Sequence, residues 1–371
     1  MRGSLDRSSG ARRCHCPAQE RKDSGHVSVA VSLPDDIRLI TTCPQSKDVP
    51  RGEYRERVEA ISRWSENAGC DGMLVYTDNS IADPWLVAQV ALRATKSLAP
   101  LVAVQPLYMH PVWAAKMIAT LATLHARRVD VNMVAGGFRN DLLALGDNLE
   151  HDRRYDRLVE YAQVMRLALE APGTFSFSGE LYEVTNARVR PSMPAELLPR
   201  FFVSGSSAAG LAAAWALGAT GVKYPQPARD EAAPAGNQEV DLGIRVGIVT
   251  RDSDREAWEI AQRRFPADRR GQVAHQLAMS VSDSEWHRQL AEREDDEEPS
   301  LDPYWLWPFQ NYRTFCPYLV GSYERVGAEI AAYLQRGFRA FILDIPTAPE
   351  ELAHSRVAFE RAFEAVVSCP R

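Results

Sequence analysis

A turn of small residues between an apolar strand and a helix is the clearest candidate for chemistry in this sequence. Gly205, Ser206 and Ser207 follow the apolar segment Arg200–Val203 and lead directly into the alanine-rich segment Ala208–Leu217. The first N–H groups of a helix have no partner inside the helix, and serine hydroxyls add further donors, so such a turn can bind an anion. We expect a phosphate here, although a turn that only caps the helix has the same pattern.

Two further features carry groups that can bind a ligand. His151 and Tyr155 are four residues apart, so they share one face of a helix and can both donate hydrogen bonds, unless they are simply a surface pair. Arg245 lies within the strand-like segment Gly243–Thr250. Because a buried charge needs a partner or an anionic ligand, we expect Arg245 to face a site.

Polar residues also mark the ends of three apolar segments. Asp78 and Asn79 follow the first of these segments, Gln105 follows the second, and Asn132 lies in the third. Turn chemistry alone explains Asp78 and Asn79. Gln105 and Asn132 mark the ends of strongly apolar strands, so they are better candidates for a ligand site.

The segments that must position these residues alternate between strand-like and helix-like patterns. Short apolar runs predict eight strands, at Ile37–Thr42, Met73–Tyr76, Pro100–Val104, Val129–Val134, Arg200–Val203, Gly221–Tyr224, Gly243–Thr250 and Ala340–Asp344. Helical patterns lie between them, as in Pro84–Lys96 and Pro111–His125. Parallel strands joined by helices predict an α/β fold, a (β/α)8 TIM barrel with insertions, in which ligands bind at the carboxyl ends of the strands.

The same patterns divide the chain. Residues 1–28 are polar and basic and lack the apolar stretch of a secretory signal, so we expect a disordered N-terminal tail. Residues 29–371 are expected to form the barrel. An alternating pattern predicts a hairpin insertion near 174–191, and a block of acids followed by aromatics predicts a lid-like insertion near 265–312.

Composition narrows the classes of function. A net charge of −6 gives no sign of nucleic-acid binding, and no apolar run reaches the roughly 18 residues that cross a membrane. Six scattered cysteines favour a reduced, cytoplasmic protein, and the cluster Cys14-His15-Cys16 lacks a second ligand pair, so we expect no metal. Neutral hydrogen-bonding groups, an anion turn and aromatics instead suit an organic cofactor.

Six motifs together resemble the bacterial luciferase-like flavin monooxygenases, in the branch of the alkanesulfonate and nitrilotriacetate monooxygenases. They are DPWLVAQVALRAT, LAPLVAVQPLYMHPVWAAKMIATL, RRVDVNMVAGG, HDRRYDR, FVSGSSAAG and GIRVGIVTRDSDREAW. The resemblance covers Ile37 to Val367. It implies a (β/α)8 barrel that forms a homodimer or homotetramer, takes reduced FMN (FMNH2) from a separate NAD(P)H:flavin reductase, and uses O2.

The resemblance also implies roles for single residues. The turn Gly205, Ser206 and Ser207 matches the loop that holds the FMN phosphate, and His151 and Tyr155 match helix residues that reach the same flavin. The remaining cofactor contacts that it implies are Asn132 beside the flavin ring, Gln105 on the other side of the ring, and Asp78 at the end of the second strand. Arg245 matches an arginine implicated in catalysis, and Asn132 is a neutral donor that can assist it.

Three positions depart from the pattern of the sulfonate enzymes. Ile81 replaces a cysteine, Gly247 replaces a histidine, and Ile345 replaces a tyrosine. Tyr224 and Arg313 match an aromatic after the sixth strand and a lid arginine, and with Ile81 they are the expected substrate contacts. The replacements argue against an alkanesulfonate and for a larger or less charged substrate in a more apolar pocket, as in secondary metabolism.

Together, these features predict a two-component FMNH2-dependent monooxygenase. It would oxygenate a small organic substrate with O2 through a flavin C4a-peroxide, with Arg245 and Asn132 as catalytic residues. Two alternatives stay open. One is a deazaflavin-dependent hydride-transfer oxidoreductase of the same fold, and the other is a non-catalytic flavin-binding paralogue.

Overall fold

Eight parallel strands close into a barrel in the computed structural model, which describes residues 34, 36–231, 241–280 and 302–368. Neighbouring strands pair in chain order, and the ring closes because β12 pairs with both β9 and β1. The barrel strands are β1 (Arg38–Thr42), β2 (Gly72–Val75), β3 (Ala99–Val104), β4 (Asp130–Val134), β7 (Phe201–Ser204), β8 (Thr220–Lys223), β9 (Leu242–Arg251) and β12 (Phe338–Leu343). The predicted (β/α)8 class is confirmed.

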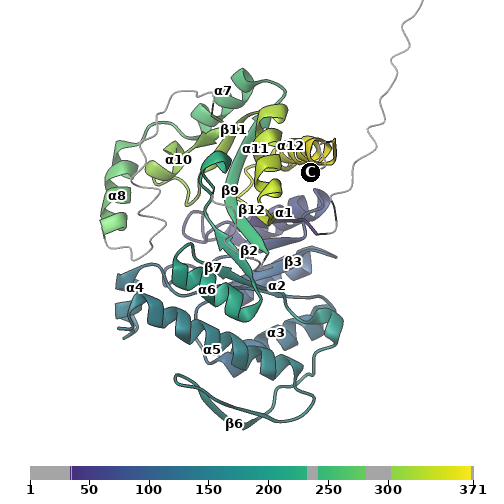
Figure 1. Cartoon of the computed structure of the whole chain (residues 1–371), viewed down its shortest axis with the longest axis vertical. Coiled ribbons are helices and arrows are strands. Elements are labelled where there is room, and N and C mark those ends of the chain that lie inside the picture. Colours follow the sequence, from purple (N-terminus) through teal and green to yellow (C-terminus); the bar gives the residue numbers. More distant parts are fainter. Residues whose placement is uncertain (1–33, 35, 232–240, 281–301, 369–371) are drawn as a thin grey trace, which may run out of the picture. The chain divides into compact units, whose positions relative to one another are not determined.

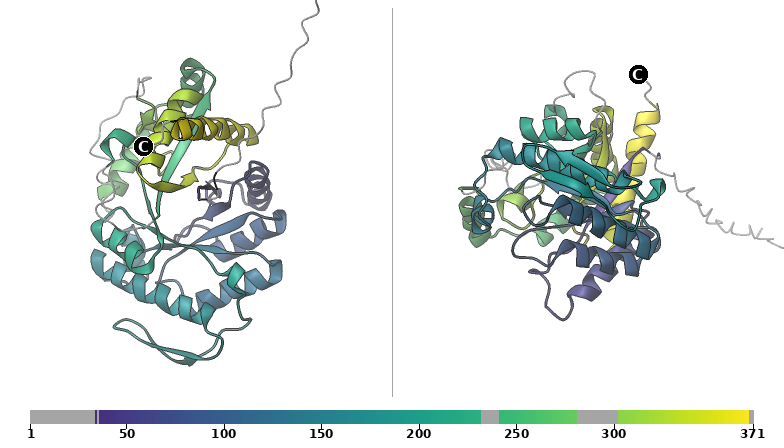
Figure 2. Two further views of the ribbon diagram at one scale, coloured as in Figure 1. Left: turned by 45° about the vertical axis from the view of Figure 1, so that its right-hand side comes forward. Right: turned by 90° about the horizontal axis from the view of Figure 1, so that it is seen from below.

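Helices cover the outside of the barrel, as Figures 1 and 2 show. They are α1 (Tyr54–Asn67), α2 (Pro84–Ala94), α3 (Pro111–His125), α5 (His151–Glu170), α6 (Ala208–Leu217), α7 (Asp254–Arg264), α11 (Tyr323–Gln335) and α12 (Pro349–Ser368). Local sequence explains their starts. Asp83 accepts hydrogen bonds from the N–H groups of Trp85 and Leu86, and Pro84 occupies the first turn of α2, where its missing N–H costs nothing.

Shorter elements interrupt this alternation. An antiparallel hairpin of β5 (Phe175–Ser178) and β6 (Glu183–Ala187) lies in the segment where a hairpin was expected, and it packs on α5. The other additions are α4 (Arg139–Ala144), α8 (Arg269–Ser280), β10 (Tyr304–Trp305), α10 (Trp307–Gln310) and β11 (Tyr318–Ser322). The predicted tail, with Cys14-His15-Cys16, and the acidic part of the predicted lid lie outside the described residues.

The strand β11 was not predicted, and it changes one wall of the barrel. The first half of β9 pairs with β12, from Leu242 to Val246. The second half pairs in parallel with β11 instead, from Gly247 to Arg251. β11 and β12 therefore lie on opposite edges of β9, because the peptide between Val246 and Gly247 accepts a hydrogen bond from Asp344 on one side and donates one to Pro317 on the other. β11 follows β8 along its edge and brings its residues close to the carboxyl end of the barrel.

An apolar floor fills the interior of the barrel. It consists of Ile40, Leu74, Leu101, Phe202, Val222, Ala340 and Ile342. Since residues two apart in a strand face the same side, the residues two positions further along lie above this floor. They include Tyr76, Ser204, Tyr224 and Asp344. None of the helices in the described part of the chain is long and apolar enough to cross a membrane.

Candidate active site

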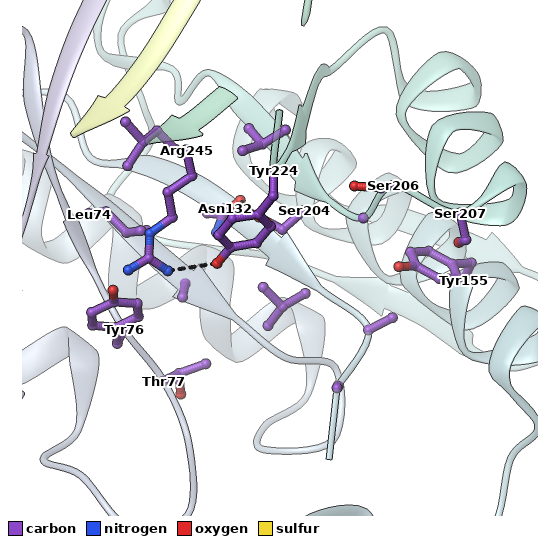
Figure 3. Close-up of a pocket in the computed structure, with 18 of the residues that line it drawn as sticks. Leu74, Tyr76, Thr77, Asn132, Tyr155, Ser204, Ser206, Ser207, Tyr224 and Arg245 are labelled. Carbon is purple, nitrogen blue, oxygen red and sulfur yellow. Dashed lines mark hydrogen bonds between the residues drawn. The ribbon is translucent and has the colours of Figure 1, made fainter. Parts of the chain in front are cut away.

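A cavity of about 190 Å³ lies above the apolar floor, at the carboxyl ends of the strands. We call it the main cavity. Figure 3 shows its labelled side chains spread along a line, with Arg245 and Tyr76 at one end and Ser207 and Tyr155 at the other. Asn132, Ser204 and Ser206 lie between the two ends, with Ser206 next to Ser207. The two ends carry different chemistry.

At the end that holds Tyr155, the adjacent residues Ser206 and Ser207 have different roles. The hydroxyl oxygen of Ser207 accepts a hydrogen bond from the N–H of Gly210 at 3.1 Å and so caps α6, which is the alternative left open for this turn. Ser206 lines the cavity, and its hydroxyl is buried without any hydrogen-bond partner. Because buried polar groups are nearly always bonded, this hydroxyl indicates a ligand.

The predicted helix pair joins the serine turn. A methyl group on Gly205 would lie 2.3 Å from the hydroxyl of Tyr155, so only glycine allows the tyrosine to approach the turn this closely. The ring of His151 meets the ring of Tyr155 edge-on, with 5.3 Å between their centroids. Both residues line the main cavity. The structure therefore brings together all five residues that were predicted around the phosphate.

At the other end, Arg245 is buried and only partly paired. Its Nη1 donates a 2.9 Å hydrogen bond to the hydroxyl of Tyr224, and its Cζ lies 4.7 Å from the centroid of the Tyr76 ring. Its Nη2 is 3.6 Å from Oδ1 of Asp344. Both Nε and Nη2 lack a hydrogen-bond partner, so the cation has donors to spare for a ligand.

Sequence reasoning missed the group that faces Arg245. Asp344 accepts hydrogen bonds through Oδ2 from Tyr318, at 2.8 Å, and from Thr314, at 2.6 Å. Tyr318 and Asp344 line a separate cavity of about 20 Å³ and neither the main nor the adjoining cavity, so the expectation of a more apolar pocket stays a prediction. Asp344 directly follows the barrel strand β12, as Gln105 follows β3, so the same strand-end argument could have found it.

The phenols at this end stay neutral. Burial raises the pKa of Tyr224 well above its usual value, and the nearby Cys316 and Asp344 add to the effect. Burial likewise raises the pKa of Tyr318, again with a contribution from Asp344. Both hydroxyls therefore remain hydrogen-bond donors over the whole range in which enzymes usually work.

Asn132 lies between the two ends. It is buried, and its Oδ1 accepts a 2.9 Å hydrogen bond from the hydroxyl of Ser204 on the neighbouring strand β7. This hydrogen bond fixes the orientation of the Asn132 side-chain amide. The two amide N–H groups then remain for a ligand. Asn132 therefore lies where the sequence predicted it, in the lining of the main cavity.

A second cavity of about 190 Å³ adjoins the first, and we call it the adjoining cavity. The two share a wall of Tyr76, Thr77, Val134, Gly136, Gly137, Tyr224 and Arg245. Asp78 and Gln105 line the adjoining cavity and not the main one. Oδ1 of Asp78 also accepts hydrogen bonds from the N–H and hydroxyl of Ser80, which is the turn chemistry considered for it.

The expected substrate residues are scattered. Tyr224 lies in the shared wall, and Ile81 lines a third cavity of about 260 Å³ together with Asp78 and Gln105. Arg313 has half of its side chain exposed, pairs with Asp268 at 2.9 Å, and lines none of these three cavities. The structure thus does not bring Arg313 to the other predicted residues.

The site as a whole suits an elongated, anionic organic ligand. At one end the hydroxyl of Ser206 lacks a hydrogen-bond partner, and at the other end Nε and Nη2 of Arg245 lack one. Among the residues that the structure describes, no group of three or more His, Cys, Asp or Glu side chains is placed to hold a metal ion.

Comparison with known proteins gives a consistent result. A family model described as luciferase-like monooxygenase matches residues 37–340. The chain is 36% identical over 312 residues to BtrO of Niallia circulans, a monooxygenase of 4-(gamma-L-glutamylamino)butanoyl-BtrI acyl-carrier protein. The match covers 82% of this chain and 91% of BtrO.

Solved structures share the fold at much lower identity. The long-chain alkane monooxygenase LadA superposes with a TM-score of 0.67 at 16% identity, over 90% of this chain and 93% of LadA. DmoA from Hyphomicrobium sulfonivorans gives 0.65 at 16% identity, over 88% of each chain. An F420-dependent secondary alcohol dehydrogenase gives 0.60 at 15% identity, over 88% of this chain and 99% of the dehydrogenase. At these identities the likeness shows the fold alone.

Proposed function

This chain belongs to the luciferase-like monooxygenase family, and from that membership we propose that it is a two-component monooxygenase that uses reduced FMN and O2. A separate NAD(P)H:flavin reductase would supply the reduced flavin. One observation carries the proposal: the buried, unpartnered hydroxyl of Ser206 lies in a cradle at one end of a cavity whose other end holds Arg245.

The serine end would hold the phosphate of FMN. Ser206 would donate its free hydroxyl to a phosphate oxygen, and the N-terminus of α6 adds unpaired N–H groups and a favourable dipole. Tyr155 packs closely against the same turn, which is possible because Gly205 has no side chain. Ser207 would contribute mainly by fixing the start of the helix.

The arginine end would face the reacting part of the site. Bound reduced FMN supplies the electrons that O2 activation needs. Arg245 would stabilise negative charge there through Nε and Nη2, since a guanidinium stays protonated in proteins. Tyr224 holds the guanidinium in place, and Asn132 adds a neutral donor. The apolar floor keeps water away from one side of the cavity.

Two of the predicted flavin contacts depend on how far the cofactor extends. The main cavity is smaller than the roughly 300–1,000 Å³ typical of organic-ligand sites, so the flavin has to reach the shared wall. Asp78 and Gln105 would meet it there, from the adjoining cavity. Arg313 has no part in this proposal, because it is bound to Asp268 at the surface.

For the substrate, we propose an acyl group held as a thioester. The support is the relative BtrO, which acts on an acyl group attached to a carrier protein and aligns with most of this chain. Tyr224, in the shared wall, is the residue we expect to lie between flavin and substrate.

The test is a reconstitution with a flavin reductase, NADH, FMN, isotopically labelled O2 and a set of acyl thioesters. We expect O2 uptake that depends on the thioester and a product that gains one labelled oxygen atom. Hydride transfer from a reduced deazaflavin without O2 uptake would favour the dehydrogenase alternative. Flavin binding without any turnover would favour the non-catalytic one.

A further inference from the structure

The adjoining cavity contains an acceptor that nothing in the protein satisfies. Gln45 follows β1, has only 6% of its surface exposed, and lines this cavity. Its Oε1 is buried without a hydrogen-bond partner. A buried acceptor of this kind is costly when unpaired, so it indicates a ligand that brings a donor.

A carboxylate lies in the same lining. Asp141, at the start of α4, is partly buried and makes no ion pair with any described residue. Lys47 lies 3.9 Å from Asp78 and is paired with that carboxylate. The lining therefore holds the carboxylates of Asp78 and Asp141 and the carbonyl oxygen of Gln45, together with the guanidinium of Arg245 in the shared wall.

The pKa values of two groups in this lining are in line with an excess of negative charge here, although burial is the larger cause. Burial raises the pKa of Asp141, and the nearby Asp78 raises it further while Lys47 opposes the shift. Tyr108 lines the same cavity, and burial together with Asp78 and Asp141 raises its pKa to about 12. A second cation at this place would relieve both effects.

The lining of the adjoining cavity also carries a positive charge, that of Arg245. Arg245 belongs to the shared wall, whereas Gln45 and Asp141 line only the adjoining cavity. Phe138, Leu142 and Phe315 supply apolar surface to the same lining. The arrangement fits a ligand with a polar or anionic reacting end, a short apolar middle and a cationic far end.

We propose that the adjoining cavity is the substrate pocket and that it binds an acyl group carrying a protonated amine, with Asp141 and Gln45 as the residues that hold the ammonium group. The inference deepens the proposed function, on which it rests for the identity of the acyl thioester. Gln45 would accept one hydrogen bond from the ammonium group, and Asp141 would provide the compensating charge.

The experiment uses two probes that differ at one group. They are the pantetheine thioesters of 4-aminobutanoate and of pentanoate, which end in an ammonium and in a methyl group on chains of equal length. Calorimetry on the FMN-loaded protein gives the Kd of each probe without requiring turnover. We expect the parent protein to bind the amino probe roughly tenfold or more tightly than the methyl probe, as for one charged hydrogen bond.

Variants assign the effect to the two residues. Asp141→Asn and Gln45→Leu should each remove most of the preference for the amino probe and leave the affinity for the methyl probe unchanged. Asp141→Glu should restore part of the preference, because it keeps the charge. Glu364→Gln, which removes an equivalent charge from the surface of α12, should change neither affinity.

Three results would overturn the inference: equal binding of the two probes by the parent protein, a preference that survives in Asp141→Asn, or a weakened affinity for FMN in that variant, which would assign Asp141 to the cofactor. The two proposals fail separately. Preferential binding of the amino probe through Asp141, without O2 uptake, would keep the amine pocket and contradict the monooxygenase.

Discussion

The phenol ring of Tyr318 lies directly against Gly247, so closely that a methyl group on the glycine would be 2.2 Å from the ring. The hydroxyl of the same tyrosine donates a hydrogen bond to Asp344, which in turn faces Arg245. A glycine in β9 thus allows β11 to bring a tyrosine to the acid beside the buried arginine. Tyr318 fills the space that a side chain at position 247 would need.

The first prediction concerns this contact. Gly247→Ala should displace the ring of Tyr318 and lower the free energy of unfolding by about 1–3 kcal/mol, the usual effect of overpacking a core. Urea unfolding measures it. Gly173→Ala is the control, because a methyl group there meets nothing within 4 Å. Equal stability of Gly247→Ala and the parent would show that the ring is not confined by the glycine.

The second prediction separates the hydroxyl of Tyr318 from its ring. Tyr318→Phe keeps the packing but removes one of the two donors to Asp344, so the acid should hold Arg245 less firmly. We expect kcat/KM to fall by about 5- to 20-fold, the equivalent of one hydrogen bond, with the Kd for reduced FMN unchanged. Steady-state kinetics beside Tyr323→Phe, a tyrosine that bonds His354 outside the cavities, provides the check. Unchanged kinetics would remove Tyr318 from the account.

The third prediction is a pH dependence. Because burial raises the pKa of Tyr224, the native state keeps a proton that an unfolded tyrosine loses near pH 10. The native state then binds more protons than the unfolded state, so the free energy of unfolding should decrease as the pH rises above about 10. Activity should show no loss from tyrosine ionisation below that pH. The phenolate absorbance of the parent minus that of Tyr224→Phe follows the group directly, and its ionisation below pH 9 would contradict the burial.

Much of this site could be predicted from the sequence because it depends on local patterns. Arg245 was found because a charge interrupts an apolar strand, and the serine turn was found because it joins a strand to a helix. The different roles of Ser207, which caps α6, and Ser206, whose hydroxyl stays unpartnered, could not be predicted. They depend on which backbone N–H each hydroxyl reaches.

The contacts between strands that are distant in the chain also could not be predicted from the sequence. Asp344 lies about 100 residues from Arg245, and Tyr318 comes from β11, whose place depends on its register with the second half of β9. The same holds for the adjoining cavity. Gln45 and Asp141 line one cavity only because the closed barrel brings the end of β1 and α4 to the same place.

The fourth prediction uses the cap of α6. Ser207→Ala removes the acceptor for the N–H of Gly210 and should lower the free energy of unfolding by about 1 kcal/mol. Ser207→Asp restores an acceptor and should recover stability, although its charge would repel a phosphate. Thermal unfolding of the two variants gives the comparison. Full stability of the alanine variant would mean that the cap is not needed.

The fifth prediction tests the central claim, that Ser206 binds the phosphate of the reduced flavin. The measurement is an anaerobic titration of the parent and of Ser206→Ala with reduced FMN and with reduced riboflavin, which lacks the phosphate. We predict that the substitution weakens FMN binding roughly tenfold or more, as expected for a hydrogen bond to a charged group, and leaves riboflavin binding unchanged. Equal losses for both flavins, or no loss for either, would contradict it.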